Sequence, residues 1–504
     1  MPAAIVSTLT LHGSSLPPFM KRFTFLLAIV GSVISTSSVL GAGGARPNVL
    51  FIAADDLRND LGCYGHPLVK TPNLDRLAAR GVKFEKAYCQ QAVCNPSRAS
   101  LLTGKRLDKL RIWDLPTHFR SNAPSAVTLP QHFKQNGYFT RSIGKIFHNW
   151  IHELQGDPDS WSVPQLYHFA NHGADKPQVT GELPPNLASD PKCECRDVPD
   201  DAYFDGRIAT LAVEALAGLK AKNEPFFLAV GFWKPHSPFN APKRYWDLYD
   251  RAEVTLPKNP DWPKDAPRVA WHNSREILSE KQRPLSEDAI REMRHGYLAA
   301  ISYMDAQVGR VLDGLARQGL ADNTIVVFWS DHGYHLGEQT LWAKTSNFEL
   351  DARVPLIIAA PDLIKGASTD ALAELMDLYP TLAEMAGLPT PQAVDGVSLV
   401  PVLRDPAEAV RQVALTQHSR PAYYKEAPET MGYSIRTASH RYTEWRDWKS
   451  GETVATELYD HSADPDETRN LATAPGKKQV VADHAALLKL LQPIVTPGWK
   501  PALP

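Results

Sequence analysis

Short apolar runs recur along the chain, and stretches with a helical period lie between them. The runs lack the strict alternation of a half-exposed strand, which is typical of strands that are buried on both faces. They occur at Asn48–Ala54, Tyr138–Ile143, Phe226–Phe232, Thr324–Trp329 and Pro355–Ala359.

The intervening stretches predict helices. Ser286 precedes a long segment in which apolar residues return every three or four positions, which gives one apolar face. Thr71, followed by Pro72, has the residue types of a helix N-cap and first turn. Alternating strands and helices predict an α/β fold with a mostly parallel or mixed central sheet and helices on both faces.

The pattern changes after about residue 410. Tyr433–Thr437 and Tyr442–Trp445 read as short strands, so we expect a smaller C-terminal subdomain with an antiparallel sheet. The expected division is an N-terminal extension with a signal peptide at 1–45, a catalytic α/β domain at 46–410 and the C-terminal subdomain at 411–504.

Two long stretches resist assignment and are rich in Pro, Trp, His and Asp. They run over Asn149–Pro199 and Asn240–Pro284. Long irregular insertions on an α/β scaffold usually carry function, so we expect these two to form the rim of a pocket.

The N-terminal region has the layout of a secretory signal. Lys21 and Arg22 precede the uncharged apolar stretch Phe23–Ile34, and small residues follow up to Ala45. The apolar stretch is too short to span a bilayer comfortably, which argues against a stable membrane anchor. We therefore expect a periplasmic or secreted protein that begins between Gly41 and Arg46.

Composition excludes several classes of protein. The 504 residues are 43% hydrophobic and 22% charged, which is an ordinary globular mixture. No long uncharged apolar run follows the N-terminal region, which excludes a polytopic membrane protein. The net charge is −2, from 54 basic and 56 acidic residues, and gives no support for binding nucleic acid.

Charged side chains follow the predicted strands where each strand ends. They are Asp55 and Asp56 after the first run, Lys145 and His148 after the second, His236 after the third, Asp331 and His332 after the fourth, and Lys344 further on. Ligands of open α/β sheets bind at the carboxyl ends of the strands. Any one of these residues alone reads as a solvated turn, but together they predict a shared site.

Cys94 lies in the most specific motif of the chain. The segment from Cys94 to Gly104 fits the pattern C-x-P-S-R-x-x-x-L-T-G. This segment resembles the signature of the type I sulfatases, in which the cysteine is oxidised to formylglycine, an aldehyde whose hydrate is the nucleophile. Outside such a motif, a buried cysteine is more often structural.

The resemblance covers nearly the whole chain from Asn48 onward. Within the family, the chain is most similar to sulfatases of 2-O-sulfated uronates. The matching blocks are Asp55–Arg58, Gly62–Gly65, Gln90–Cys94, Gly144–His148, Lys234–His236, Ser330–Gly333, Trp342–Lys344 and Met431–Thr437, with the ending from Glu457 to Leu471.

The resemblance implies a divalent cation. Its ligands would be Asp55, Asp56, Asp331, His332 and the modified Cys94. Carboxylates are oxygen ligands of the kind that Ca²⁺ and Mg²⁺ prefer, whereas histidine is unusual for calcium.

The resemblance also assigns roles around the cation. Arg98 and Lys145 would hold the hydrate and the sulfate, and Lys344 would contact the sulfate. His148 would take a proton from the hydrate, and His236 would protonate the departing sugar oxygen. The implied partners are a sulfated saccharide and the enzyme that converts Cys94 to formylglycine.

The substrate expected from the resemblance is a 2-O-sulfated uronic acid residue of a polysaccharide. Arg436 or Lys344 could pair with its carboxylate, although a structural ion pair is the simpler reading of Arg436. Alternatives are another sulfated glycan, a phosphonate or phosphate ester on the same scaffold, and a non-catalytic secreted glycan-binding protein. A two-zinc phosphatase would need more His and Asp ligands than the strand ends provide.

The remaining cysteines are Cys63, Cys89, Cys193 and Cys195. We expect Cys63 and Cys89 to be buried or paired. Cys195 sits where relatives have half of a disulfide, but Cys193 has no clear counterpart, so the pairing is left open.

Overall fold

The computed structural model describes residues 46–148, 156–167, 193–272, 276, 285–389 and 393–491. The chain divides into two compact units, Met1–Gly44 and Ala45–Pro504, and the description below concerns the second unit. The predicted signal segment lies outside the described residues. Among the described helices, none is both long and apolar enough to cross a membrane.

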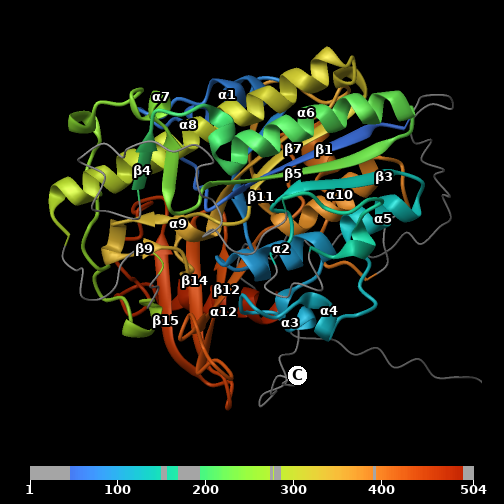
Figure 1. The fold of residues 1–504 in the computed structure, drawn as a ribbon. Helices are drawn as coiled ribbons and strands as arrows, with labels where there is room; N and C mark the ends of the chain where they lie inside the picture. Colours follow the sequence, from blue (N-terminus) through green and yellow to red (C-terminus); the bar gives the residue numbers. More distant parts are fainter. Residues whose placement is uncertain are drawn as a thin grey trace, which may run out of the picture. The chain divides into compact units, whose positions relative to one another are not determined.

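A mixed seven-stranded sheet forms the centre of this unit (Figure 1). Parallel pairing joins β3 to β5, β5 to β1, β1 to β7 and β11 to β2, whereas β10 runs antiparallel to both β2 and β7. The strands, in spatial order, are β11 (Ala367–Glu374), β2 (Val82–Tyr88), β10 (Arg353–Ala359), β7 (Thr324–Ser330), β1 (Asn48–Asp55), β5 (Phe226–Pro235) and β3 (Phe139–Gly144).

Helices cover both faces of this sheet, as the sequence predicted. Alternate residues of β1 enter different cores, with Leu50 and Ile52 on one side and Val49 and Phe51 on the other. The first side is covered by α1 (Pro72–Ala78), α6 (Phe204–Lys222) and α8 (Glu287–Arg317). The second is covered by α2 (Cys94–Thr103), α5 (Leu129–Gln135), α10 (Leu378–Met385) and α11 (Val400–Arg404).

The predicted helix starts are present. Ser286 caps α8, because its hydroxyl accepts a hydrogen bond from the Ala289 amide at 3.2 Å. Thr71 precedes α1 with Pro72 in the first turn, but its hydroxyl donates to Asp75 Oδ1 at 3.1 Å and does not cap the helix.

A second, antiparallel sheet follows in the C-terminal part, as predicted (Figure 1). Its strands are β12 (Ala414–Arg420), β13 (Thr430–Arg436), β14 (His440–Asp447) and β15 (Thr453–Asp460). Helix α12 (Lys478–Leu491) packs on β13 and β14. Since β12 also contacts β2 and β11, this sheet adjoins the central one.

Short elements connect these layers. The short helices and strands are α3 (Leu107–Leu110), α4 (Phe119–Asn122), β4 (Cys193–Arg196), β6 (Phe239–Pro242), α7 (Lys243–Trp246), β8 (His335–Leu336), β9 (Trp342–Ala343) and α9 (Glu349–Ala352). Single 3₁₀ turns lie at Gly62–Tyr64, Pro158–Ser160, Asp200–Ala202, Arg251–Glu253, Arg268–Ala270, Ala321–Asn323, Glu338–Thr340 and Leu375–Asp377. The two unassigned stretches of the sequence are described only in part.

All five cysteines lie in described segments, and none of them is in a disulfide. Cys89, Cys193 and Cys195 are buried and Cys63 is half-buried. Cys193 and Cys195 lie in β4, which pairs with β6, so their neighbourhood is held by a strand pair and not by a disulfide.

Candidate active site

Two adjacent parallel strands bring the predicted carboxylates together. Ala54 of β1 pairs with Ser330 of β7, so that the residues after each strand leave the sheet side by side. Asp56 has a φ of 63°, in the left-handed region, and its amide donates to Asp331 Oδ1 at 3.2 Å. This turn places Asp55 and Asp56 beside Asp331 at the carboxyl edge of the sheet.

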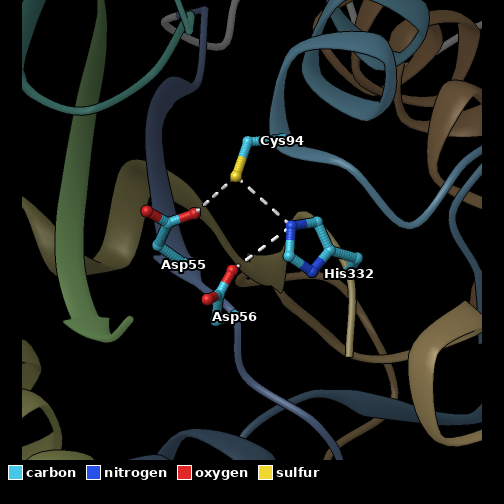
Figure 2. A group of neighbouring side chains, drawn as sticks. All are labelled: Asp55, Asp56, Cys94 and His332. Atoms are coloured by element: carbon cyan, nitrogen blue, oxygen red, sulfur yellow. Dashed lines mark hydrogen bonds and ion pairs between the residues drawn. The ribbon is translucent and has the colours of Figure 1, made fainter. Parts of the chain in front are cut away.

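Cys94 faces this edge from the first position of α2 (Figure 2). Its Sγ lies 3.5 Å from Asp55 Oδ1 and 3.3 Å from His332 Nε2. His332 Nε2 lies 3.3 Å from Asp56 Oδ1. One ligand atom from each of these four residues falls within 4.8 Å of the others, so the group could hold a metal ion.

Asp331 borders the same group. Its Oδ1 lies 3.7 Å from His332 Nε2, and its Oδ2 accepts a hydrogen bond from Arg98 Nε at 2.7 Å. The structure therefore brings all five predicted metal ligands to one place, with Asp331 turned partly toward Arg98.

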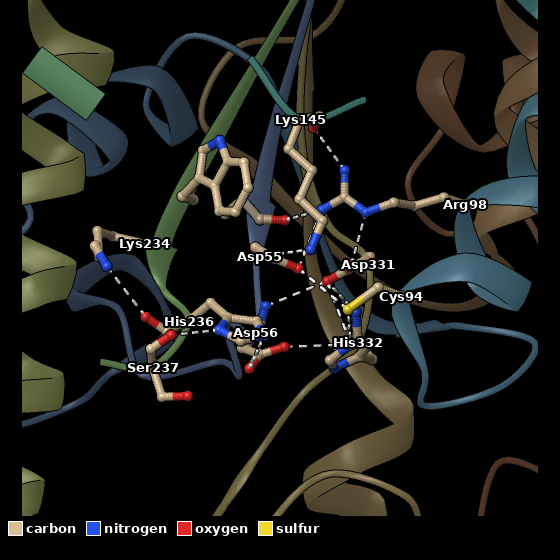
Figure 3. A network of polar contacts seen from close by, with 12 residues as sticks. Asp55, Asp56, Cys94, Arg98, Lys145, Lys234, His236, Ser237, Asp331 and His332 are labelled. Atoms are coloured by element: carbon tan, nitrogen blue, oxygen red, sulfur yellow. Dashed lines mark hydrogen bonds and ion pairs between the residues drawn. The ribbon is translucent and has the colours of Figure 1, made fainter. Parts of the chain in front are cut away.

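Three buried cations pair with the three carboxylates. Figure 3 shows Lys145 beside Asp55 and Arg98 beside Asp331. Lys145 Nζ donates to Asp55 Oδ2 at 2.5 Å, and Arg98 Nε donates to Asp331 as above. Lys344 Nζ donates to both oxygens of Asp56, at 2.9 Å each. These pairs offset the cost of burying three negative charges together.

The Arg98 guanidinium also bonds to the backbone. Nη1 donates to the carbonyls of Lys145 and Ile146 at 2.7 and 3.1 Å, and Nη2 donates to the Ala54 carbonyl at 3.2 Å. Because Arg98 is fully buried, it ties α2 to the ends of β1, β3 and β7. Arg98 therefore stabilises the geometry of the site and also contributes a positive charge to it.

The contacts of His236 indicate that its ring carries the proton on Nδ1 and not on Nε2, which faces Lys344. Its Nδ1 lies 2.7 Å from the Ser237 carbonyl, the geometry of an Nδ1–H donor, and its Nε2 lies 3.1 Å from Lys344 Nζ, the geometry of an acceptor. Burial and the charge of Lys344 lower the pKa of His236 to about 3. The imidazole is therefore neutral at neutral pH.

His148 and Cys94 are buried beside the same charges. Burial, reinforced by Lys145, lowers the pKa of His148 well below its ordinary value, so the ring is a neutral base. Burial and the carboxylate of Asp55 raise the pKa of the Cys94 thiol. An unmodified Cys94 would be a neutral thiol at neutral pH, which is a poor nucleophile.

Glu276 is a site residue that the sequence did not reveal. Its carboxylate accepts from Lys344 Nζ at 2.9 Å and lies 3.2 Å from His236 Nε2. Burial would raise the pKa of Glu276, but the charge of Lys344 outweighs it and holds the pKa at about 2. Glu276 falls in a stretch without hydrophobic period, so no sequence signal marked it.

Two further candidates have structural contacts. His335 Nδ1 lies 2.6 Å from Asp351 Oδ1 and its Nε2 lies 3.0 Å from Gln339 Oε1, in a fully buried setting. Arg436 donates to Glu349 at 3.3 Å and to the Thr437 carbonyl. The ion-pair reading of Arg436 therefore fits the structure better than contact with a sugar.

Comparison with known proteins identifies the family. The sulfatase family model matches residues 47–388, and the model of the N-sulphoglucosamine sulphohydrolase C-terminal region matches residues 337–493. The iduronate 2-sulfatase of Mus musculus is 35% identical, covering 95% of this chain and 99% of that protein. The human iduronate 2-sulfatase is 36% identical, covering 84% and 90%.

A solved structure supports the same family assignment. A protein described as a 2-O GAG sulfatase superposes with a TM-score of 0.70 at 25% identity, covering 88% of this chain and 91% of that one. The predicted fold and the predicted resemblance are thus confirmed. The chain belongs to the sulfatase family and is a sulfuric ester hydrolase.

Proposed function

We propose that this sulfatase removes the 2-O-sulfate of a terminal uronic acid residue in a polysaccharide. The observation that carries the proposal is the group of Asp55, Asp56, Cys94 and His332, with Lys145, Lys344 and His236 around it. The choice of sugar is supported by the two iduronate 2-sulfatases and by the 2-O GAG sulfatase structure.

The donor atoms fit a divalent cation. Carboxylates of Asp55, Asp56 and Asp331 predominate, which favours Ca²⁺ or Mg²⁺ over a transition metal. His332 Nε2 lies 3.3 Å from both the Asp56 oxygen and Cys94 Sγ, so it would be the fourth protein ligand. When bound, the cation would neutralise sulfate oxygens and orient the ester.

Cys94 fits conversion to formylglycine. Its neutral, buried thiol is unsuited to attack, and the hydrated aldehyde would supply an oxygen nucleophile at the same place. Conversion calls for a maturation enzyme as a partner of the chain.

The chain's own residues would divide the remaining work. Lys145 and Lys344, which pair with Asp55 and Asp56, would contact sulfate oxygens, and Arg98 would keep Asp55 and Asp331 in place. His148, as a neutral base, would accept a proton from the nucleophile. His236 would donate a proton to the leaving sugar oxygen.

His236 must first acquire that proton. The proton would come from solvent as the substrate binds, because an incoming anionic ester favours the protonated ring, while Lys344, 3.1 Å from Nε2, keeps its charge. Lys344 would also be the first candidate to pair with the uronate carboxylate, because Arg436 is bound to Glu349.

We also propose export to the periplasm or outside the cell, directed by residues 1–45. The support is the charged, apolar and small-residue order of Lys21 to Ala45.

The test is a comparison of two sulfated sugars. Sulfate release should be fast from a terminal 2-O-sulfated uronate and at least tenfold slower from a 6-O-sulfated hexosamine. Cys94→Ser, purified in parallel, controls for contaminating sulfatase. Equal rates on both sugars, or preference for the hexosamine, would remove the uronate assignment.

A further inference from the structure

A cavity of about 310 Å³ lies next to the nucleophile segment. One wall is the loop that follows α3, and the other is the loop between β12 and β13. Its lining residues are Val93, Trp113, Asp114, Leu115, Pro116, Ala422, Tyr423 and Tyr424. Val93 is bonded directly to Cys94, so the cavity shares a backbone segment with the active site.

The signature segment fixes the first wall. Asn95 Nδ2 donates to the carbonyls of Asp114 and Thr117 at 2.9 and 2.8 Å. Gln91 Nε2 donates to the Trp113 carbonyl at 2.8 Å. Residues on both sides of Cys94 thus hold this loop, which keeps the cavity in a constant position relative to the nucleophile.

The second wall brings tyrosines from the other sheet. Tyr423 is 39% exposed, whereas Trp113 is buried and packs edge-on against Trp448 with ring centroids 5.2 Å apart. The accessible phenol of Tyr423 is a surface on which the apolar face of a sugar ring packs well, and the buried indole of Trp113 backs the opposite wall. The volume lies at the lower end of the range for small-molecule sites, which suits a single ring.

The charge of the residues that line the cavity restricts the class of ligand that can bind there. Among the described residues that line the cavity, Asp114 is the only charged one. Its carboxylate accepts from the Thr117 amide and hydroxyl at 2.9 Å each, and it offers an acceptor to a sugar hydroxyl or amide. A sulfate or a second uronate beside it would meet repulsion without a cation to offset it.

We infer that this cavity is a binding site for the neighbouring saccharide residue, and that this residue is uncharged. The inference rests on the proposed function, since it assumes a polysaccharide substrate. Its sugar ring would pack on Tyr423 and hydrogen-bond to Asp114, while the sulfated residue occupies the site at Cys94.

Tyr423→Ala tests the packing contact, and Tyr423→Phe is the matched control that keeps the ring. The measurement is kcat/KM on a 2-O-sulfated uronate joined to an unsulfated hexosamine, divided by kcat/KM on the 2-O-sulfated monosaccharide. Tyr423→Ala should lower this ratio about fivefold relative to the wild type, whereas Tyr423→Phe should keep the wild-type ratio. An unaltered ratio in Tyr423→Ala would overturn the inference.

Asp114→Asn tests the charge and keeps an acceptor for the Thr117 amide. The wild type should prefer the disaccharide with the unsulfated hexosamine over its 6-O-sulfated form by about fivefold, the factor for like charges about 4 Å apart in water. Asp114→Asn should abolish this preference, and an unchanged preference would refute the role of Asp114. Failure of the wild type on both the disaccharide and the monosaccharide would instead refute the proposed function.

Discussion

His236→Ala should slow hydrolysis of sugar sulfates far more than hydrolysis of an activated aryl sulfate. A sugar alkoxide is a poor leaving group and needs a proton as the ester bond breaks, whereas a nitrophenolate leaves without one. The variant removes the His236 imidazole, whose Nε2 lies 3.1 Å from Lys344 Nζ and 3.6 Å from Asp56 Oδ2.

The expected pH dependence of kcat follows from the pKa of His236 in the free enzyme and from the charge of the bound sulfate. With a pKa of about 3, only about one His236 in 10⁴ is protonated at pH 7 in the free enzyme. A sulfate charge about 4 Å away contributes about 4 kcal/mol at an effective dielectric constant of 20, which restores about a thousandfold. The descending limb of kcat should therefore lie near pH 6, with activity falling as pH rises because the protonated ring is the active form.

The assay compares kcat on the 2-O-sulfated uronate and on 4-nitrophenyl sulfate. His236→Ala should lose about 10²- to 10⁴-fold on the sugar and less than about tenfold on the aryl ester. His148→Ala is the matched control, because a base that acts on the nucleophile is needed for both esters. An equal loss on both esters in His236→Ala would refute its role as the acid.

Three other outcomes are expected. Cys94→Ser should lower kcat by at least about 10³-fold with an unchanged unfolding temperature, and peptide mass spectrometry of active protein should find an aldehyde in place of the thiol; full activity with an intact thiol would contradict the mechanism. Exhaustive chelation should abolish turnover and added Ca²⁺ or Mg²⁺ should restore it, while Asp331→Asn should not be restored; activity that persists without metal would exclude the cation. Burial raises the pKa of Glu457 to about 7, so the folded state binds a proton that the unfolded state lacks between pH 4.5 and 7. Unfolding free energy should fall by about 3 kcal/mol as pH rises across that window, and urea titration of Glu457→Gln should find this loss removed.

The strands predicted from the sequence include the most deeply buried strands of the central sheet and also the edge strand β3. β1, β5 and β7 are buried along their whole length, so their composition is apolar and their ends are sharp. β2 was missed because Lys83, Glu85 and Lys86 interrupt its apolar residues. β11, at the sheet edge, begins with partly exposed polar residues and lacks an apolar run.

The residues of the site, like the strands, could be predicted from the sequence only in part. The positions of Asp55, the last residue of β1, and Asp331, which directly follows β7, could be predicted from the rule that parallel strands end at a common edge. Glu276 has no such position and joins the site only through the folded path of its loop. The cavity between Trp113 and Tyr423 likewise lies between segments about 300 residues apart in the sequence, and no local sequence pattern predicts that these segments lie together.

The charge arrangement explains why cation and sulfate would bind together. Asp55, Asp56 and Asp331 are buried with Lys145, Lys344 and Arg98 as partners, and breaking one such buried pair costs several kcal/mol. A divalent ion that takes up these carboxylate oxygens weakens the pairs of Lys145 with Asp55 and of Lys344 with Asp56, although Lys344 keeps Glu276 as a partner. An anion can then pair with the two amines. A sulfate ester supplies that anion at the same edge, so each guest offsets the cost of the other. Arg98 differs, because its backbone hydrogen bonds hold it in place whichever partner the carboxylates have.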